Sequence, residues 1–136
     1  MKVVIVGGVA GGATAAARIR RLDEHAEIVV FEKSGYVSYA NCGLPYYIGG
    51  EIEDKRELTL QTPESFYARF RVDMRVHHEV IAVDVKAKTV KVRNLASGEV
   101  FSESYDKLIL STGARPIKPN FEGIDNERIF TLRTVE

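Results

Sequence analysis

Two features of this sequence could do chemistry: a glycine-rich turn near the N-terminus and the single cysteine of the chain, Cys42. The turn Gly7-Gly8-Val9-Ala10-Gly11-Gly12 follows the apolar run Val3–Val6, and Glu32 closes the next apolar run. A glycine turn between a buried strand and a helix, with an acid after the second strand, is typical of a dinucleotide site. Because Cys42 comes soon after that acid, the pattern indicates redox chemistry on sulfur beside a flavin or a nicotinamide.

The turn departs from the usual pattern at one position. The first and third glycines of the pattern are Gly7 and Gly12, but Val9 stands where a second glycine normally lets the backbone approach the pyrophosphate. Gly8 and Gly11 keep the turn adaptable, and the pyrophosphate would rest on the start of the following helix. An acid at position 32 disfavours a ribose 2′-phosphate. The alternative is a glycine turn that only packs a strand against a helix.

Cys42 lies in the segment Tyr39-Ala40-Asn41-Cys42-Gly43-Leu44-Pro45-Tyr46. The proline and the apolar residues around it predict a helix that the cysteine caps, and a helix N-terminus favours a thiolate. Paired-thiol flavin reductases carry Cys-x4-Cys here, whereas the second place in this chain is Tyr47. Cys42 must therefore work alone, through a mixed disulfide, a persulfide or a sulfenic acid. The alternative is an inert, packed thiol.

The bulk composition excludes several classes of protein. The chain has 136 residues with 19 basic and 19 acidic side chains, unlike the basic surface of a nucleic-acid binder. One cysteine rules out an internal disulfide framework and fits a cytoplasmic protein. Glycines interrupt the apolar N-terminal run, which argues against a signal peptide, and no stretch is apolar enough to span a membrane. No metal is expected, because His25, His77 and His78 lack a set of ligand partners.

The order of the elements predicts an α/β fold. Apolar runs at 2–6 and Glu27–Phe31, with a helix from about Gly12 to Leu22 between them, form a βαβ unit. Thr62-Pro63-Glu64 starts a further helix that carries Ser65–Phe70, after a surface loop at Glu51–Glu57. A small antiparallel β-meander and a third parallel strand complete the prediction. Their expected ranges are Val80–Val85, Thr89–Leu95, Val100–Tyr105 and Leu108–Leu110.

The end of the third parallel strand decides between the two dinucleotides. Ser111-Thr112-Gly113-Ala114 is a turn of small residues after a β-meander, which is the usual second contact of flavoproteins that bind two dinucleotides. We therefore expect a Rossmann-like FAD-binding domain. Its first segment would span 1–116, and 117–136 would connect it to an NAD(P)H-binding domain that these residues do not include.

These motifs together resemble the single-cysteine pyridine nucleotide-disulfide oxidoreductases, and in particular the N-terminal part of CoA-disulfide and CoA-persulfide reductases. The resemblance runs from Val3 to Pro116, and Asn41-Cys42-Gly43-Leu44-Pro45 is its most specific part. It implies that Cys42 is the redox nucleophile and that Val80 contacts FAD through its backbone. The FAD contacts that it implies are Gly7, Val9, Ala10, Gly11, Gly12, Glu32, Lys33, Asn41, Cys42, Val80, Thr112 and Gly113.

The same resemblance implies a CoA channel. Thr14, Arg18 and Arg21 share one face of the first helix by their spacing, although such a stripe is often only a solvated face. In the similar reductases this face lines the channel together with Ser38 and Asn41. Position 18 varies among them, and Phe70 stands where some members have a lysine.

The sequence thus predicts the FAD-dependent part of an NADH- or NADPH-linked reductase that acts on a CoA-linked disulfide or persulfide. We expect a homodimer with no nucleic-acid or membrane partner, and little turnover from residues 1–136 alone. One alternative is an NADH oxidase or peroxidase that cycles Cys42 through a sulfenic acid. Another is a FAD-binding module without catalysis.

Overall fold

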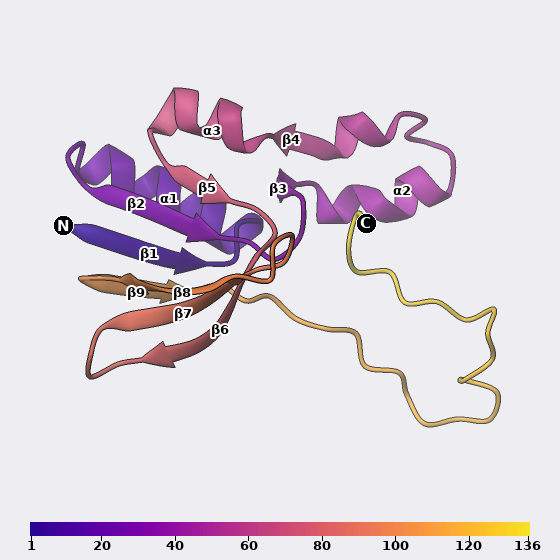
Figure 1. Cartoon of the computed structure of the whole chain (residues 1–136). Coiled ribbons are helices and arrows are strands. Elements are labelled where there is room, and N and C mark those ends of the chain that lie inside the picture. Colours follow the sequence, from indigo (N-terminus) through magenta and orange to yellow (C-terminus); the bar gives the residue numbers. More distant parts are fainter.

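A computed structural model describes the whole chain, residues 1–136. Its centre is a four-stranded parallel sheet with the strand order β5-β2-β1-β9 (Figure 1). The strands are β1 (Lys2–Val6), β2 (Glu27–Phe31), β5 (Asp73–Arg75) and β9 (Lys107–Leu110). β1 pairs with β2 on one side and with β9 on the other, so residues that follow these three strands gather at one edge. The predicted α/β fold is confirmed.

The helix α1 (Ala10–Leu22) covers one face of the sheet. Its alanines Ala13, Ala16 and Ala17 are buried against sheet residues such as Ile5 and Val30. Small side chains let the helix lie close to the strands, which brings its first turn near the ends of β1 and β9. α1 begins two residues before the predicted start, because Ala10 and Gly11 are already helical.

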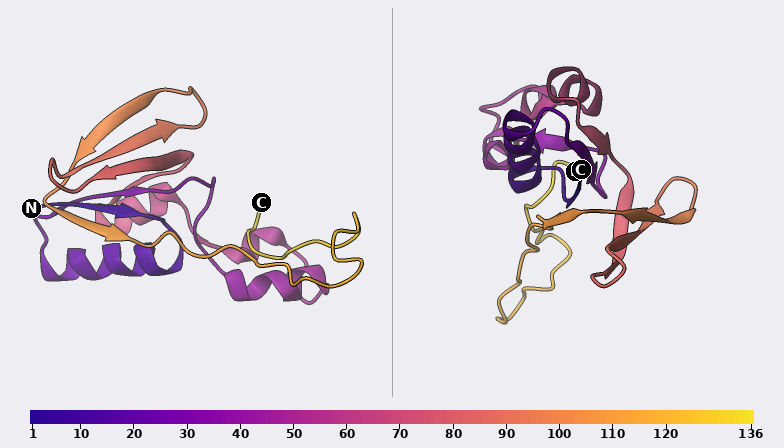
Figure 2. Two further views of the ribbon diagram at one scale, coloured as in Figure 1. Left: turned by 90° about the horizontal axis from the view of Figure 1, so that it is seen from below. Right: turned by 90° about the vertical axis from the view of Figure 1, so that its left-hand side faces the viewer.

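The predicted meander covers the other face of the sheet (Figure 2). It consists of β6 (His78–Asp84), β7 (Thr89–Asn94) and β8 (Val100–Ser104), paired antiparallel in that order. Val90 and Val92 of β7 are fully buried against Val4 and Phe31 of the parallel sheet. The alternation in β7 places its apolar side chains inward, as a period of two requires.

The sequence did not indicate two further pairings. The strand β5 extends the parallel sheet beyond β2, and the sequence analysis predicts no element at these residues. The segment 33–61 contains β3 (Val37–Tyr39) paired antiparallel with β4 (Thr59–Gln61). Strands of three residues are too short to show a period, and their pairing spans many intervening residues. Between them lie two 3₁₀ turns, η1 (Asn41–Gly43) and η2 (Lys55–Leu58), and the short helix α2 (Leu44–Ile48).

The helix α3 (Pro63–Phe70) begins as predicted. The Thr62 hydroxyl accepts a hydrogen bond from the Ser65 N–H at 3.2 Å, and the Ser65 hydroxyl accepts one from the Thr62 N–H at 2.9 Å. Pro63 occupies the first turn, where its missing N–H costs nothing. The hydrogen bond of Thr62 to Glu64 holds the pKa of Glu64 below its usual range.

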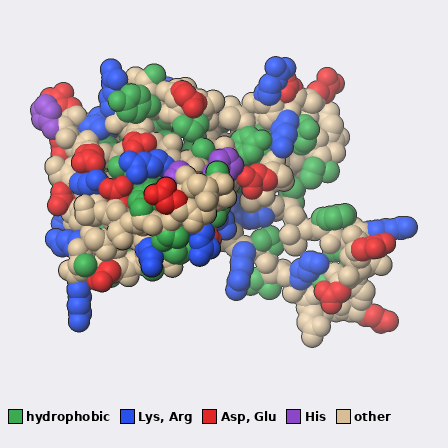
Figure 3. Space-filling view, viewed as in Figure 1, with side chains coloured by type: hydrophobic (Ala, Val, Ile, Leu, Met, Phe, Trp, Pro, Cys, Tyr) green, Lys and Arg blue, Asp and Glu red, His purple; other side chains and the backbone are tan.

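After β9 the chain forms no helix or strand. The segment 117–136 extends away from the sheet and returns, so that its end lies near α2 (Figure 1). On the face seen in Figure 3, acidic and basic side chains are intermixed. None of the helices combines the length and the apolar character that crossing a membrane requires.

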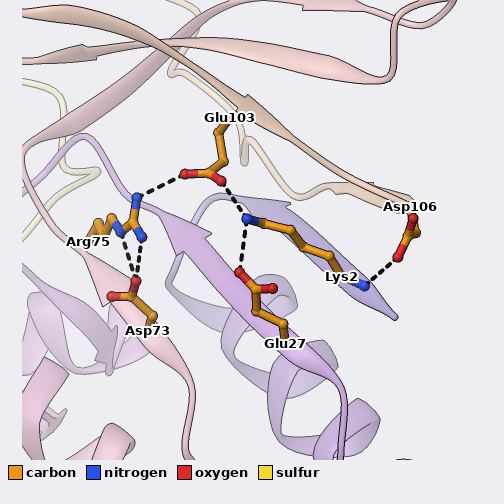
Figure 4. Close-up of polar contacts among 6 residues, drawn as sticks. All are labelled: Lys2, Glu27, Asp73, Arg75, Glu103 and Asp106. Atoms are coloured by element: carbon orange, nitrogen blue, oxygen red, sulfur yellow. Dashed lines mark hydrogen bonds and ion pairs between the residues drawn. The ribbon is translucent and has the colours of Figure 1, made fainter.

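A network of charged side chains joins the meander to the parallel sheet (Figure 4). Glu103 of β8 contacts Lys2 of β1 at 2.6 Å and Arg75 of β5 at 3.0 Å. Lys2 also contacts Glu27, and Arg75 contacts Asp73. Burial acts to raise the pKa of Glu103, but the hydrogen bond and charge of Lys2, with those of Arg75, outweigh it and hold that pKa below its ordinary value. The network therefore stabilises the fold while Glu103 is ionised.

We predict that Glu103→Gln lowers the free energy of unfolding by about 1–3 kcal/mol at neutral pH, because Lys2 and Arg75 lose their shared carboxylate. The folded-state pKa of Glu103 lies below its ordinary value of 4.5, so the stabilisation is present above that pH and is lost as the pH falls through the folded-state pKa. Urea denaturation at a series of pH values measures this. The matched control is Glu99→Gln on the exposed meander turn; an equal effect of both substitutions contradicts the prediction.

Candidate functional site

A cleft of about 590 Å³ lies at the carboxyl ends of β1, β2 and β9, and we call it the first cleft. Ligands of open α/β sheets bind at this edge, outside the ends of the strands. The cleft is lined by the glycine turn after β1, by Glu32 after β2 and by the small-residue turn after β9. Its lining residues from these three segments are Gly7, Val9, Ala10, Gly11, Glu32, Lys33, Ser34, Ser111, Thr112, Gly113 and Ala114.

The glycine turn is held by close backbone contacts. Gly7 has a φ of +100°, which L side chains rarely adopt, and a Cβ there would overlap the carbonyl oxygen of Ser111. A Cβ at Gly12 would overlap the carbonyl oxygen of Gly7. Only glycine at these two positions lets β1, α1 and the turn after β9 converge. Gly12 thus lies beneath the cleft and shapes it without lining it.

The first turn of α1 faces the first cleft without a side-chain cap. Val9 occupies the N-cap position and makes no side-chain hydrogen bond, and the first turn contains no acidic residue. The backbone N–H groups of this turn have no intrahelical acceptor, and the helix dipole makes this end positive. A phosphate group is the ligand that such an end accepts best.

The side chain of Glu32 is fixed by two backbone hydrogen bonds. One carboxylate oxygen accepts from the Gly8 N–H at 2.7 Å and the other from the Ser34 N–H at 2.9 Å. Glu32 is the one buried charged residue of the chain and lines the first cleft. Each oxygen keeps a free acceptor site, so the carboxylate can receive hydrogen bonds from the two hydroxyls of a ribose.

Asn41 carries an unsatisfied polar atom. Its Oδ1 is buried and has no hydrogen-bond partner. A buried acceptor without a donor is rare and needs an explanation such as a ligand. Asn41 lines the first cleft, and a ligand bound there could supply the missing donor.

The structure brings most of the predicted cofactor residues together. All of them line the first cleft except Gly12 and Cys42. No sequence pattern indicated three further lining residues, which come from a segment expected to be only a connector. They are Arg133, Thr134 and Glu136. Arg133 donates a hydrogen bond from Nε to the Ala114 carbonyl oxygen at 2.8 Å. His78 also lines the cleft, with Nδ1 2.7 Å from the Val76 carbonyl oxygen.

A second cleft, also of about 590 Å³, is lined by residues of α1 and of the segment that contains Cys42. Four of the five residues predicted for the CoA channel line it, and Arg18 does not. The four are Thr14, Arg21, Ser38 and Asn41. The other lining residues are mostly apolar and include Phe66 and Phe70, whose ring centroids lie 4.9 Å apart. The two clefts share Val9, Ala10, Tyr39 and Asn41.

The prediction that Cys42 caps the following helix is wrong. Cys42 lies inside the 3₁₀ turn η1, and the N-cap of α2 is Gly43. The 3₁₀ turn displaces the start of the helix to Leu44, which leaves Pro45 in the first turn, where its missing N–H costs nothing. The side chain of Cys42 is exposed. It is thus open to a ligand in the second cleft and lies next to Asn41, which both clefts share.

The fold and these two clefts define a class of nucleotide-dependent redox protein. The family model of the pyridine nucleotide-disulphide oxidoreductases matches residues 1–136, and the chain belongs to that family.

Particular relatives sharpen this assignment. The chain is 50% identical to the Coenzyme A disulfide reductase of Staphylococcus aureus (strain Newman) over 99% of its own length and 30% of that protein. The crystal structure of reduced Bacillus anthracis CoADR-RHD is similar to this chain, with 51% sequence identity and a TM-score of 0.86. The match covers 90% of this chain and 22% of the Bacillus chain. The structure of a NAD-dependent persulfide reductase from A. fulgidus is also similar, with 38% sequence identity and a TM-score of 0.91. That match covers 99% of this chain and 26% of the A. fulgidus chain. The chain therefore spans about a third or less of each relative.

We predict that Gly12→Ala lowers the free energy of unfolding by about 2–3 kcal/mol or more, although alanine is the better helix former. The reason is the overlap of its Cβ with the carbonyl oxygen of Gly7. Urea denaturation measures the loss. Gly98→Ala in the meander turn is the control, because it has a positive φ but open space around it and should cost about 1 kcal/mol. A Gly12→Ala variant as stable as the wild type contradicts the proposed close packing.

Proposed function

We propose that this chain is the FAD-binding part of an NADH- or NADPH-linked reductase that reduces a CoA-linked disulfide or persulfide through Cys42. One observation carries the proposal. The nucleotide cleft and the cleft that contains the lone thiol meet at Asn41, the residue before Cys42. The names of the relatives support the substrate class, since they are a Coenzyme A disulfide reductase and a persulfide reductase.

The residues of the first cleft fit FAD. The uncapped start of α1 suits the pyrophosphate, the carboxylate of Glu32 suits the ribose hydroxyls, and the orphan Oδ1 of Asn41 suits a donor of the ligand. Lys33, Val80, Thr112 and Gly113 would complete the site, with Arg133 from the chain end. When bound, FAD supplies the electron pair that it receives from the nicotinamide.

The chemistry of Cys42 follows from thiol–disulfide exchange. Its thiolate attacks one sulfur of the substrate disulfide R–S–S–R, which forms Cys42–S–S–R and expels the first thiolate R–S⁻. An electron pair then breaks the bond between Cys42 and that sulfur, which releases the second R–S⁻ and restores the Cys42 thiolate. The reaction consumes two electrons and two protons for each pair of thiols. With a persulfide R–S–S–H the same electron count gives R–S–H and hydrogen sulfide.

The second cleft suits an acceptor with an apolar arm and a phosphate. Its walls are mostly apolar, whereas Thr14 and Arg21 of α1 give it a hydroxyl and a cation. An arginine recognises phosphate through several donors at once. Thr14 and Ser38 would hold the acceptor while its sulfur reaches Cys42.

The remaining parts of the proposal concern the whole protein. We infer that 1–116 is the first segment of the FAD-binding domain and that 117–136 leads towards the NAD(P)H-binding domain. We also infer a cytoplasmic homodimer and little turnover from residues 1–136 alone.

We predict that Cys42→Ser in the full-length reductase lowers the reduction of CoA disulfide and CoA persulfide by about three orders of magnitude or more, because the nucleophile is lost. NAD(P)H-dependent reduction of ferricyanide should remain, since it does not need the thiol. Both rates are measured on the same flavin-loaded preparation. If the rate of disulfide reduction stays within about tenfold of wild type, the activation free energy has changed little. That result would favour a FAD-binding module in which Cys42 is only a packing residue. Consumption of oxygen in place of sulfur acceptors would favour an oxidase.

We predict that Arg21→Ala raises the KM for CoA disulfide by about tenfold, which corresponds to about 1.4 kcal/mol, because a charge-assisted contact to phosphate is lost. Arg18→Ala is the matched control, because Arg18 lies on the same helix but outside the lining of the second cleft. It should change the KM by less than about twofold, as for an exposed charge. Equal effects of the two substitutions would show that the structure does not separate these arginines.

A further inference from the structure

We propose that Val135 is a positioning residue for Cys42, and that residues 133–136, here called the return segment, join the nucleotide cleft to the cysteine turn. The inference rests on the proposed function, because it concerns how Cys42 is held for that chemistry. Residues 133–136 would then help to position Cys42, in addition to connecting two domains.

The return segment is attached to the domain at three points. Arg133 donates from Nε to the Ala114 carbonyl oxygen at 2.8 Å, in the turn after β9. Glu136 accepts a hydrogen bond from the Gly35 N–H at 3.0 Å, close to the end of β2. Between them Val135 is buried, with only 5% of its surface exposed, although nearly all of 117–132 is exposed. The segment therefore bridges two edges of the first cleft.

Val135 packs into a small apolar cluster that we call the cysteine platform. Its buried members are Tyr39, Leu44, Leu58 and Val135. The first three come from the segment that contains Cys42, and Val135 is the one buried member from a distant part of the chain. Leu44 begins α2 directly after the Cys42 turn, and Leu58 lies so close to Gly43 that a Cβ there would be 2.6 Å from its Cδ2. The cluster thus supports the residues on the C-terminal side of Cys42.

The platform also fixes the other side of the turn. The Ala40 N–H donates to the Leu58 carbonyl oxygen at 2.8 Å, and Gly43 donates back to the Ala40 carbonyl oxygen at 3.0 Å. Thr134 and Glu136, on either side of Val135, line the first cleft. One short segment therefore contacts the nucleotide cleft through its flanking residues and the cysteine platform through Val135. A shift of this segment would move the Cys42 turn relative to a bound cofactor.

The test compares Val135→Ala with Val90→Ala in the full-length, flavin-loaded reductase. Val90 is a fully buried valine of the meander core, so its substitution gives a similar loss of packing away from the platform. The first readout is the rate of Cys42 alkylation by iodoacetamide over a range of pH, followed by mass spectrometry of the tryptic peptide 34–55. The second is the rate at which CoA disulfide reoxidises the flavin, set against the rate of flavin reduction by NAD(P)H.

We expect Val135→Ala to alter the alkylation rate and to slow reoxidation by about fivefold or more, because small misplacements of a reacting group are costly. Flavin reduction should change by less than about twofold, since this step does not use the thiol. Val135→Ile, which keeps the branched side chain, should leave the alkylation rate and the reoxidation rate at their wild-type values. Val90→Ala should lower only the stability. Equal alkylation in Val135→Ala and Val90→Ala would overturn the inference while leaving the proposed function intact. Disulfide reduction by Cys42→Ser would instead overturn the proposed function, and the alkylation comparison would still test the position of Cys42.

Discussion

The contact between the backbone of Gly7 and that of Gly12 is the constraint on which the rest of the site depends. Because neither residue has a Cβ, the start of α1 can lie against the end of β1, and the turn after β9 can lie against both. This closeness leaves the uncapped helix terminus facing the first cleft. It also fixes Gly8, whose N–H holds the carboxylate of Glu32 and whose carbonyl oxygen accepts from the Ser38 N–H at 3.0 Å. A side chain at either glycine would separate all of these groups.

The same turn explains why two clefts lie side by side. Val9 and Ala10 contribute to the lining of both, so the start of α1 forms part of the wall between them. Tyr39 and Asn41, from the segment that contains Cys42, also line both clefts. Tyr39 is buried there, and this burial raises the pKa of its hydroxyl. Cys42 therefore lies at the boundary of a nucleotide site and a largely apolar cleft.

The sequence was sufficient for the parts of the fold that local patterns encode. Buried apolar runs predicted β1, β2 and β9, and the proline and capping threonine predicted α3. The three-residue strands β3, β4 and β5 could not be recognised, because they are too short for a period and pair with distant partners. Most of the cofactor residues predicted from the glycine turn and the family resemblance line the first cleft. Helical spacing alone could not separate Arg18 from Arg21, since only the position of the neighbouring elements decides which arginine reaches a cleft.

The position of the chain end was likewise beyond reach from the sequence. Nothing local in residues 133–136 indicates that they return to the cleft, since their partners lie near positions 35, 39 and 114.

The central claim is that Cys42 alone forms the disulfide bond with the substrate sulfur. The most direct measurement is mass spectrometry of the flavin-loaded protein after incubation with CoA disulfide, under conditions that preserve disulfides. We predict one CoA moiety on the tryptic peptide 34–55, attached through a bond that a reductant removes. Turnover of CoA disulfide with no such adduct on this peptide would contradict the claim.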